Sequence, residues 1–270
     1  MEDKEYLQLA QLIYEYCGIS YFNNLSSLKF KAANRLKELG LSCWEYCGYL
    51  RMDPNEWDIL IELITVNETY FFREEYLLQE IQSVILPQYR DRSTTNPLKI
   101  WCAACSSGEE PYTIAMLVEE SQLFESGSVK IIASDINKKV LANAQAAKYN
   151  KKSFSFRKMP PGALAKFFIE SEEDYQVKDS IKEMVEFRRI NLYDDFFAEL
   201  SPLDIVVCRN VLIYFDKPVS QKIITSFYNV LKPGGYLFLG HSESLSMFDH
   251  HFQTIYTENL FYYKKEGNPL

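Results

Sequence analysis

LKIWCAACSSGEEP, residues 98–111, is the stretch that decides the fold. Its first six residues are an apolar run that predicts a buried strand, and the small residues after it, up to Gly108, predict a tight turn. The acids that follow open a helix that we expect to reach Ser121. The first turn between strand and helix in an open parallel sheet is the usual place for a nucleotide-like ligand. This stretch therefore predicts both an α/β sheet and one edge of its binding site.

The alternation of strand and helix continues along the chain after this stretch. Further strands are expected over 129–134, 204–208, 236–240 and 254–264, and further helices over 138–147 and 217–231. Alternating strands and helices imply a parallel sheet with helices on both faces. Residues 150–189 interrupt this pattern, and we interpret them as an inserted β subdomain whose hairpin pairs 166–169 with 175–178.

The residues before this sheet favour helices and show no strong strand signal before Asn96. The helix signals are, in order, a stop at Gly18, a cap at Ser26 or Ser27, a stop at Gly40, a first-turn proline at Pro54 and a final helix over 74–89. The polar residues 91–97 predict a linker. We therefore expect an all-helical N-terminal domain over 1–90, followed by an α/β domain over 98–270.

The composition of the chain excludes several classes of function. With 29 Lys and Arg against 37 Asp and Glu, the net charge of −8 makes the protein a poor general binder of nucleic acid. No segment approaches the ~20 apolar residues of a membrane span, and no apolar run of signal length follows the acidic start. Six Cys do not suggest a disulfide framework, and no second Cys or His pair stands at ligand spacing from Cys102 and Cys105. We expect a cytoplasmic protein with no metal site, no membrane insertion and no nucleic-acid partner.

The charge of the ligand turn indicates which ligand it holds. Glu109 and Glu110 would oppose a pyrophosphate at the helix start, and the Gly-x-Gly-x-x-Gly pattern is absent. The same acids suit a ligand with positive groups and no phosphate, such as S-adenosylmethionine, although acids at a helix start also complement its dipole. Asp135 ends the second strand, where a carboxylate accepts hydrogen bonds from ribose or caps the next helix. Together these acids favour an adenosine cofactor without phosphate.

Five groups of residues form a pattern that runs from Asn67 to Glu243. They are NETYFFRE at 67–74, CSSGEEPY at 105–112, ASDI at 133–136, CRNVLIYF at 208–215, and LKPGG at 231–235 followed by GHSE at 240–243. The combination resembles the chemotaxis receptor methyltransferase family (CheR), which uses S-adenosylmethionine to methylate glutamate side chains of proteins. The resemblance implies a Rossmann-like methyltransferase sheet with a small inserted β hairpin subdomain, behind the helical N-terminal domain. It also implies the products, glutamate methyl esters and S-adenosylhomocysteine.

The resemblance further implies which positions bind the cofactor. They are Asn67, Thr69 and Arg73 in the first motif, Glu110 near the methionine ammonium, Asp135 on the ribose, Asn191 and Leu192 near the adenine, and Arg209 and Asn210 after the fourth strand. The phenol of Tyr214 matches a position near the transferred methyl group, although Tyr214 beside Phe215 also suits a core aromatic.

The chemistry of methyl transfer agrees with these residue types. An exposed glutamate titrates near ~4.3, so the acceptor is already ionised at neutral pH and alignment matters more than a base. We expect Arg73 and Tyr214 to be the catalytic residues. Arg73 could hold the acceptor carboxylate through its planar guanidinium, or it could form a surface ion pair with Glu74 or Glu75.

The partner implied by the resemblance is the cytoplasmic helical domain of a chemotaxis receptor. The helix expected over 26–39 carries four bases, Lys29, Lys31, Arg35 and Lys37, against one acid. We hypothesise that this helix docks on the acidic receptor, although such a run of charge is also typical of a solvated helix face. The turn at 170–174 is short and acidic, without the glycine-rich turn of family members that hold a receptor tail. We therefore expect direct recognition of the helical bundle, without a tether. We also expect a monomer.

Two other classes of function remain open at this point. A methyltransferase of the same architecture that modifies exocyclic amino groups often carries an Asn-Pro-Pro-Tyr-like turn where this chain has Arg209-Asn210-Val211-Leu212. A protein that binds S-adenosylmethionine as a signal, without catalysis, would carry the same cofactor residues. Transfer of a labelled methyl group to a receptor fragment distinguishes both from the implied enzyme.

Overall fold

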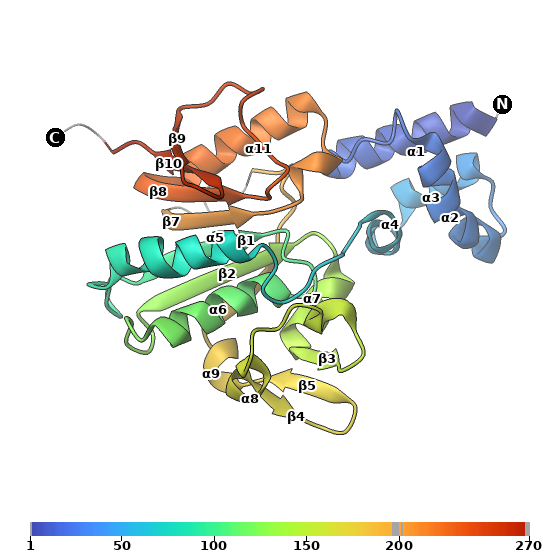
Figure 1. Ribbon diagram of the computed structural model, residues 1–270. Coiled ribbons are helices and arrows are strands. Elements are labelled where there is room, and N and C mark those ends of the chain that lie inside the picture. The colour runs from blue at the N-terminus through green and yellow to red at the C-terminus, as the bar shows by residue number, and fades with distance from the viewer. Residues whose placement is uncertain (1, 196–199, 201, 268–270) are drawn as a thin grey trace.

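A seven-stranded sheet forms the centre of the computed structural model, which describes residues 2–195, 200 and 202–267 (Figure 1). The strand order is β6-β2-β1-β7-β8-β10-β9. The strands are β1 (Leu98–Ala103), β2 (Val129–Asp135), β6 (Val185–Arg189), β7 (Leu203–Cys208), β8 (Leu231–Leu239), β9 (Phe252–Tyr256) and β10 (Phe261–Lys265). The first five strands in this order run parallel, whereas β10 and β9 are antiparallel additions at the edge. This arrangement confirms the predicted α/β class.

The central strands are buried on both faces because helices cover each side. All residues of β7 are buried, which is typical of a parallel strand with two covered faces. Along β1, Ile100 and Cys102 pack with helix α6 (Glu109–Ser121) on one face, while Trp101 and Ala103 pack with helix α11 (Lys217–Val230) on the other. Figure 1 shows α6 and α11 on opposite sides of the strands, with α7 (Lys138–Ala146) beside α6.

The first four helices form a hydrophobic core of their own, at one side of the sheet (Figure 1). They are α1 (Glu2–Cys17), α2 (Leu25–Leu39), α3 (Cys43–Met52) and α4 (Glu56–Ile64). The predicted stop at Gly40 is confirmed, and its φ of 66° explains why glycine stands there. Two details of the predicted helix starts are wrong: Asn24 rather than a serine caps α2, by accepting from the Ser27 amide, and Pro54 lies before α4 rather than in its first turn.

The helical segment after this core belongs by its packing to the sheet. It consists of α5 (Glu75–Glu80), a π-helical turn η1 (Ile81–Ile85) and a 3-10 turn η2 (Leu86–Tyr89). Leu77, Leu78 and Ile81 pack into the same core as α6, whereas the core of the first four helices contains no buried residue of the described chain after Ile64. The division of the chain at residue 90 stays a prediction, and the packing groups 75–89 with the sheet.

Charged side chains form part of the boundary between the two cores. Asp58 of α4 pairs with Lys138 at 2.6 Å and with Arg189 at 2.6 Å, and Lys139 pairs with Glu62 beside them. These ion pairs join α4 to α7 and to β6. Apolar contacts cross the boundary as well, because Tyr14 of α1 packs against the core that contains α11 and Ile136 packs against the core of the first four helices.

The insertion carries a small three-stranded sheet of order β3-β5-β4. Its elements are β3 (Lys148–Asn150), η3 (Phe154–Phe156), α8 (Ala163–Phe167), β4 (Phe168–Glu170), β5 (Asp174–Val177) and α9 (Asp179–Lys182). The predicted hairpin is present, but its strands are Phe168–Glu170 and Asp174–Val177, with Phe168 opposite Val177, and residues 166–167 belong to α8. The third strand, β3, starts two residues before the predicted insertion.

Three strand predictions need correction. Residues 185–189, assigned above to the insertion, form β6 of the main sheet, parallel to β2. The expected last strand over 254–264 is a hairpin, β9 and β10, that turns after Tyr256. Strand β8 begins at Leu231, and its register against β7 shifts near Leu203. Among the described residues, no helix is long and apolar enough to cross a membrane.

Candidate active site

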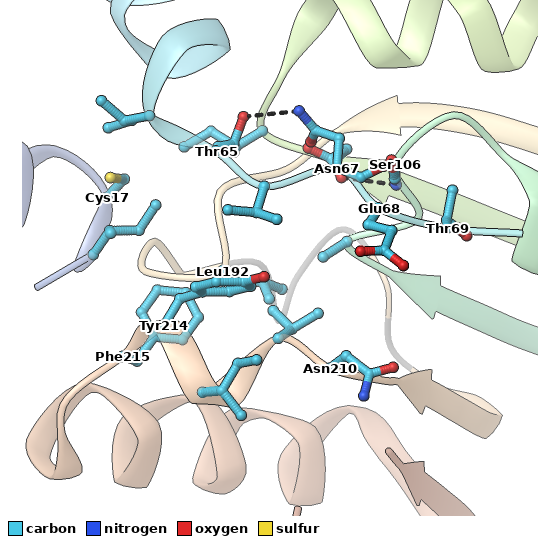
Figure 2. Close-up of a pocket in the computed structure, with 18 of the residues that line it drawn as sticks. Cys17, Thr65, Asn67, Glu68, Thr69, Ser106, Leu192, Asn210, Tyr214 and Phe215 are labelled. Carbon is cyan, nitrogen blue, oxygen red and sulfur yellow. Dashed lines mark hydrogen bonds between the residues drawn. The ribbon is translucent and has the colours of Figure 1, made fainter. Parts of the chain in front are cut away.

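A cavity of about 470 Å³ lies where the helical core meets the carboxyl ends of β1, β2 and β7. It is lined by every residue predicted above for catalysis or cofactor binding, namely Asn67, Thr69, Arg73, Glu110, Asp135, Asn191, Leu192, Arg209, Asn210 and Tyr214. Carboxyl ends of neighbouring parallel strands meet at one edge of a sheet, which explains why motifs far apart in the sequence converge. Figure 2 shows the Asn67–Thr69 segment on one side of the cavity and Tyr214 on the other.

The turn after β1 forms the floor of this site. Ala104, Ser106 and Gly108 all have positive φ, at 54°, 51° and 94°, so the backbone bends sharply and Ser106 meets the next strand. The Ser106 amide donates to the carboxylate of Asp135 at 2.9 Å, and the Asn137 amide donates to its other oxygen at 2.9 Å. Burial raises the pKa of Asp135. Asn137, rather than Asp135, caps α7, so the Asp135 carboxylate is left at the cavity wall.

The two acids that open α6 have different environments. Glu109 is buried and accepts hydrogen bonds from the hydroxyls of Ser107, at 2.7 Å, and Ser155, at 2.8 Å, which fastens the insertion to the helix start. Burial raises the pKa of Glu109. Glu110 instead lines the cavity. Only the second of the two adjacent acids is therefore available to a ligand.

Arg209 stands at the centre of the charged groups. It pairs with Glu110 at 3.0 Å and with Glu74 at 3.2 Å, and it donates to the carbonyl of Arg73 at 2.6 Å. Burial raises the pKa of Glu110 to about 7, against the opposing effect of Arg209. Burial also opposes ionisation of Glu74, but Arg209 and His241 lower its pKa below the usual value. One guanidinium shared by two carboxylates leaves a local excess of negative charge, which favours a cationic ligand.

Arg73 lies at the rim of the cavity. Its guanidinium donates to the carbonyl of Glu68 at 3.3 Å and stands 5.6 Å from the ring centre of Tyr70. Neither Glu74 nor Glu75 forms an ion pair with Arg73 within the described part of the chain, so that alternative is not what the structure has. The guanidinium can therefore bind a carboxylate of a substrate.

The loop after β7 is held by one buried carboxylate, that of Glu243. It accepts four backbone N–H bonds, from Asn210 at 2.6 Å, Gly240 at 2.8 Å, Leu212 at 2.8 Å and Val211 at 2.9 Å. A Cβ atom at Gly240 would lie 2.8 Å from the Glu243 Oε2 atom, so only glycine fits there. Sequence reasoning quoted Glu243 in a motif but assigned it no role. The buried Oδ1 atom of Asn210 has no partner among the described atoms, so it can accept from a ligand.

Tyr214 ends the short helix η4 (Leu212–Tyr214) that this loop leads into. It lines the cavity and is half-buried, and burial raises the pKa of its phenol, so it is not a core aromatic. The carbonyl of Tyr214 accepts from the Ser20 amide at 3.4 Å, and the next residue, Phe215, forms a β-bridge with Ile19. The loop therefore touches both the sheet and the helical core.

Asn191 and Leu192 line the cavity from the segment after β6. The amide group of Asn191 donates to the carbonyl of Tyr16 at 2.8 Å, and its oxygen accepts from the Tyr193 amide at 3.2 Å. Both ends of this side chain are thus used within the protein. The expected contact with adenine stays a prediction for Asn191 and Leu192.

The helical core supplies a wall of the cavity that the sequence did not predict. Thr65 accepts a hydrogen bond from the side chain of Asn67 at 3.2 Å (Figure 2) and another from the side chain of Asn137 at 2.9 Å. It thus joins this wall to the first motif and to the start of α7. Tyr21 and Lys31 also line the cavity, and both donate to the carbonyl of Ile64. Burial lowers the pKa of Lys31. No local pattern marks such residues, because their position depends on how the helices pack.

The four basic residues of the predicted docking helix have separate roles in α2. Lys29 pairs with Asp3 at 2.8 Å, and Lys31 points to the cavity wall as described above. Arg35 makes two hydrogen bonds, of 2.7 and 2.9 Å, to Glu56, whose side chain is only 1% exposed and also accepts from the Tyr46 phenol. Lys37 is exposed. Arg35 thus holds α2 against α4 and α3.

Residues 67–261 match the family described as CheR methyltransferase, SAM binding domain. The chain belongs to this family. It is similar to Chemotaxis protein methyltransferase 1 of Pseudomonas aeruginosa, at 37% identity over 73% of each chain, and to Chemotaxis protein methyltransferase Cher2 of Pseudomonas putida, at 33% identity over 93% of this chain and 94% of the relative. Among solved structures, the CMeT domain of the citrinin polyketide synthase aligns with a TM-score of 0.45 at 13% identity, covering 72% of this chain and 53% of that one, which is too distant to carry an argument.

This CheR methyltransferase uses S-adenosylmethionine as its cofactor, and the cavity fits that molecule. The volume lies in the range of about 300–1,000 Å³ typical of small-molecule sites. The carboxylates of Glu110 and Asp135 suit an ammonium group and ribose hydroxyls, and the free Oδ1 of Asn210 is a further acceptor. The phosphate-free ligand expected from the two acids is consistent with this lining.

Proposed function

We propose that this enzyme methylates glutamate side chains in the cytoplasmic helical domain of chemotaxis receptors, forming glutamate methyl esters and S-adenosylhomocysteine. The observation that carries the proposal is that one cavity is lined by all ten predicted site residues, while Arg73 at its rim forms no ion pair with a carboxylate of the described residues. The relatives named as chemotaxis methyltransferases support the choice of substrate.

The chain's own residues would bind and align the reactants. S-adenosylmethionine supplies a methyl group on a positively charged sulfur when it is bound. Glu110 and Arg209 would hold the charged end of the cofactor, and Asp135 the ribose. Because a glutamate acceptor is already ionised at neutral pH, no side chain has to remove a proton, and positioning supplies most of the rate gain.

Arg73 and Tyr214 are the residues proposed to orient the acceptor. The guanidinium of Arg73 would donate to one carboxylate oxygen and leave the other free to attack. The raised pKa of Tyr214 keeps its phenol protonated at neutral pH, so the phenol can also donate to the acceptor. A single bond from each residue fixes direction without removing the charge that makes the carboxylate reactive.

The docking of the receptor on α2 is proposed for a smaller set of residues than the sequence indicated. Lys37 is exposed, and the pair of Lys29 with exposed Asp3 is weak enough to exchange, so both can meet acidic receptor side chains. Arg35 is engaged with buried Glu56 and is left out of this surface. We further propose that the enzyme acts in the cytoplasm and recognises the helical bundle of the receptor directly, without a tether.

The proposal is tested with methyl-labelled cofactor and the cytoplasmic fragment of a receptor from the same genome. We expect label on the fragment that base releases as methanol, because carboxyl methyl esters are base-labile and N-methyl groups are not. Tyr214→Phe should keep cofactor binding and lose most of the transfer, whereas Arg73→Ala should lose the transfer and also weaken cofactor binding. Full cofactor binding with no transfer by the unchanged protein would indicate a binding protein instead, and base-stable label would indicate another methyltransferase class.

A further inference from the structure

Two arginines from different parts of the chain stand around one aromatic ring at the rim of the cavity. The Cζ atom of Arg73 lies 5.6 Å from the ring centre of Tyr70, and that of Arg157 lies 3.7 Å from it. The two guanidinium groups are therefore separated by no more than the sum of these distances. Arg157 comes from the insertion, directly after η3, so the inserted subdomain supplies a cation beside the predicted catalytic arginine.

The segment that carries Arg157 is the most basic in the chain for its length. Residues 148–158, KYNKKSFSFRK, contain five bases and no acid in a protein whose net charge is −8. Lys152 and Lys158 are exposed, and no ion pair of either is present within the described residues. Between them Phe154 is 80% exposed. The surface formed by Lys152, Phe154, Arg157 and Lys158 is called the insertion surface below.

The insertion surface is fixed relative to the cavity. The Phe71 amide donates to the carbonyl of Ser155 at 2.9 Å, and the Ser155 hydroxyl donates to buried Glu109 at 2.8 Å. These bonds join η3 to the motif that contains Arg73 and to the start of α6. A partner whose side chain reaches Arg73 therefore meets the insertion surface in a set geometry.

We propose that Arg157, supported by Lys152 and Lys158, binds a second acidic side chain of the protein substrate, about one helical turn from the glutamate that is methylated. This inference rests on the proposed function. Side chains one turn apart on a helix have Cβ atoms about 5–6 Å apart, and their carboxylates can reach two guanidiniums that share the Tyr70 ring. The surface thus selects acceptor sites with acidic neighbours.

Glu68 occupies Arg157 when no substrate is bound. The pair is 3.0 Å long, but the side chain of Glu68 is 66% exposed and that of Arg157 is 37% exposed. Exposed pairs of this kind contribute little and exchange readily. A substrate carboxylate can replace Glu68 on Arg157. Until it does, Glu68 competes with it and lowers the affinity of Arg157 for the substrate. The local positive charge at the mouth of an otherwise acidic protein favours an acidic helix as the occupant.

The test compares Arg157→Gln with Arg188→Gln, which removes a partly exposed arginine that pairs with Glu186 on β6. With the receptor fragment as substrate, we expect Arg157→Gln to raise KM for the fragment at least fivefold while kcat and the dissociation constant of S-adenosylmethionine stay within twofold. Arg188→Gln should change none of them. Glu68→Gln should shift KM in the opposite direction, because it removes the competing carboxylate.

A second fragment, with the acids one turn on either side of each acceptor glutamate changed to glutamine, completes the cycle. The unchanged enzyme should show a raised KM for it, and Arg157→Gln should have no further effect. Equal losses on both fragments, or a raised KM in both Arg157→Gln and Glu68→Gln, would show that the ion pair only supports the fold and would overturn the inference. Base-labile labelling with an unchanged KM overturns this inference alone, whereas absence of labelling overturns the proposed function with it.

Discussion

Replacing Glu243 by glutamine tests whether one carboxylate sets the loop that carries Asn210 and leads to Tyr214. Each oxygen of Glu243 accepts two backbone N–H groups, and the side chain is only 5% exposed. Glutamine has nearly the same shape but offers one acceptor oxygen and one NH2 group. Whichever way the amide turns, two of the four N–H donors that hold the closed arrangement of the loop, Glu243 and Gly240 then face another donor.

The size of the effect follows from those two lost bonds. Hydrogen bonds to a charged group contribute about 1.5–3 kcal/mol each, so the closed loop loses at least ~3 kcal/mol. About 1.4 kcal/mol corresponds to a factor of ten in an equilibrium, so opening of the loop becomes at least ~100-fold more frequent. Because Asn210 lines the cofactor cavity, we expect kcat to fall at least tenfold and cofactor affinity to weaken with it.

Hydrogen exchange at the amides of Asn210, Val211 and Leu212 measures this opening directly. The exchange should accelerate at these amides while the strands of the sheet keep their protection. Glu183→Gln, at an exposed glutamate of the insertion, is the matched control and should leave both exchange and kcat unchanged. Unchanged exchange at the three amides in a folded Glu243→Gln protein would refute the role of this carboxylate.

Three further predictions concern charge and packing. Because the pKa of Glu110 is about 7 and the cationic cofactor favours its ionised form, the dissociation constant of S-adenosylmethionine should rise by up to about fivefold as pH falls from 7 to 6. Calorimetry should find this slope absent in Glu110→Gln. Arg35→Gln leaves buried Glu56 without its cation and should lower the free energy of unfolding by about 3 kcal/mol in urea titrations, the low end of the usual range because the Arg35 side chain is 21% exposed. Gly108→Ala should lower the melting temperature by at least ~2–4 °C. The φ of 94° at this position disfavours alanine, and the new Cβ atom would lie 2.9 Å from the Cβ atom of Ala144. An unchanged melting temperature would contradict this packing.

The strands and site residues that could be predicted share a property that the sequence displays locally. Strand β1 was predicted with its observed bounds because a fully buried parallel strand is a continuous apolar run. The predicted positions Glu110, Asp135 and Arg209 meet in one cavity because each follows a strand of the same sheet, so their convergence depends only on topology.

The features that escaped prediction depend on packing between distant segments. Strand β6 lies at the edge of the sheet, and its alternating charges, including Glu186 and Arg188, hide it among the polar residues of the insertion. The engagement of Arg35 by Glu56 and the place of Lys31 in the cavity wall follow from how α2 and α4 pack. A charge pattern along one helix cannot distinguish a docking surface from such internal contacts.

The ion pairs at the boundary between the two cores have a consequence for thermal unfolding. Ion pairs such as those of Asp58 with Lys138 and Arg189 are screened by salt, so at high ionic strength the helical half should melt ahead of the sheet in the ligand-free enzyme. A bound cofactor that contacts both the helical core and the sheet links the two. At a concentration of 100 times its dissociation constant, the cofactor adds about 2.7 kcal/mol to the free energy of unfolding of the bound enzyme. Two separate calorimetric peaks should then merge into one.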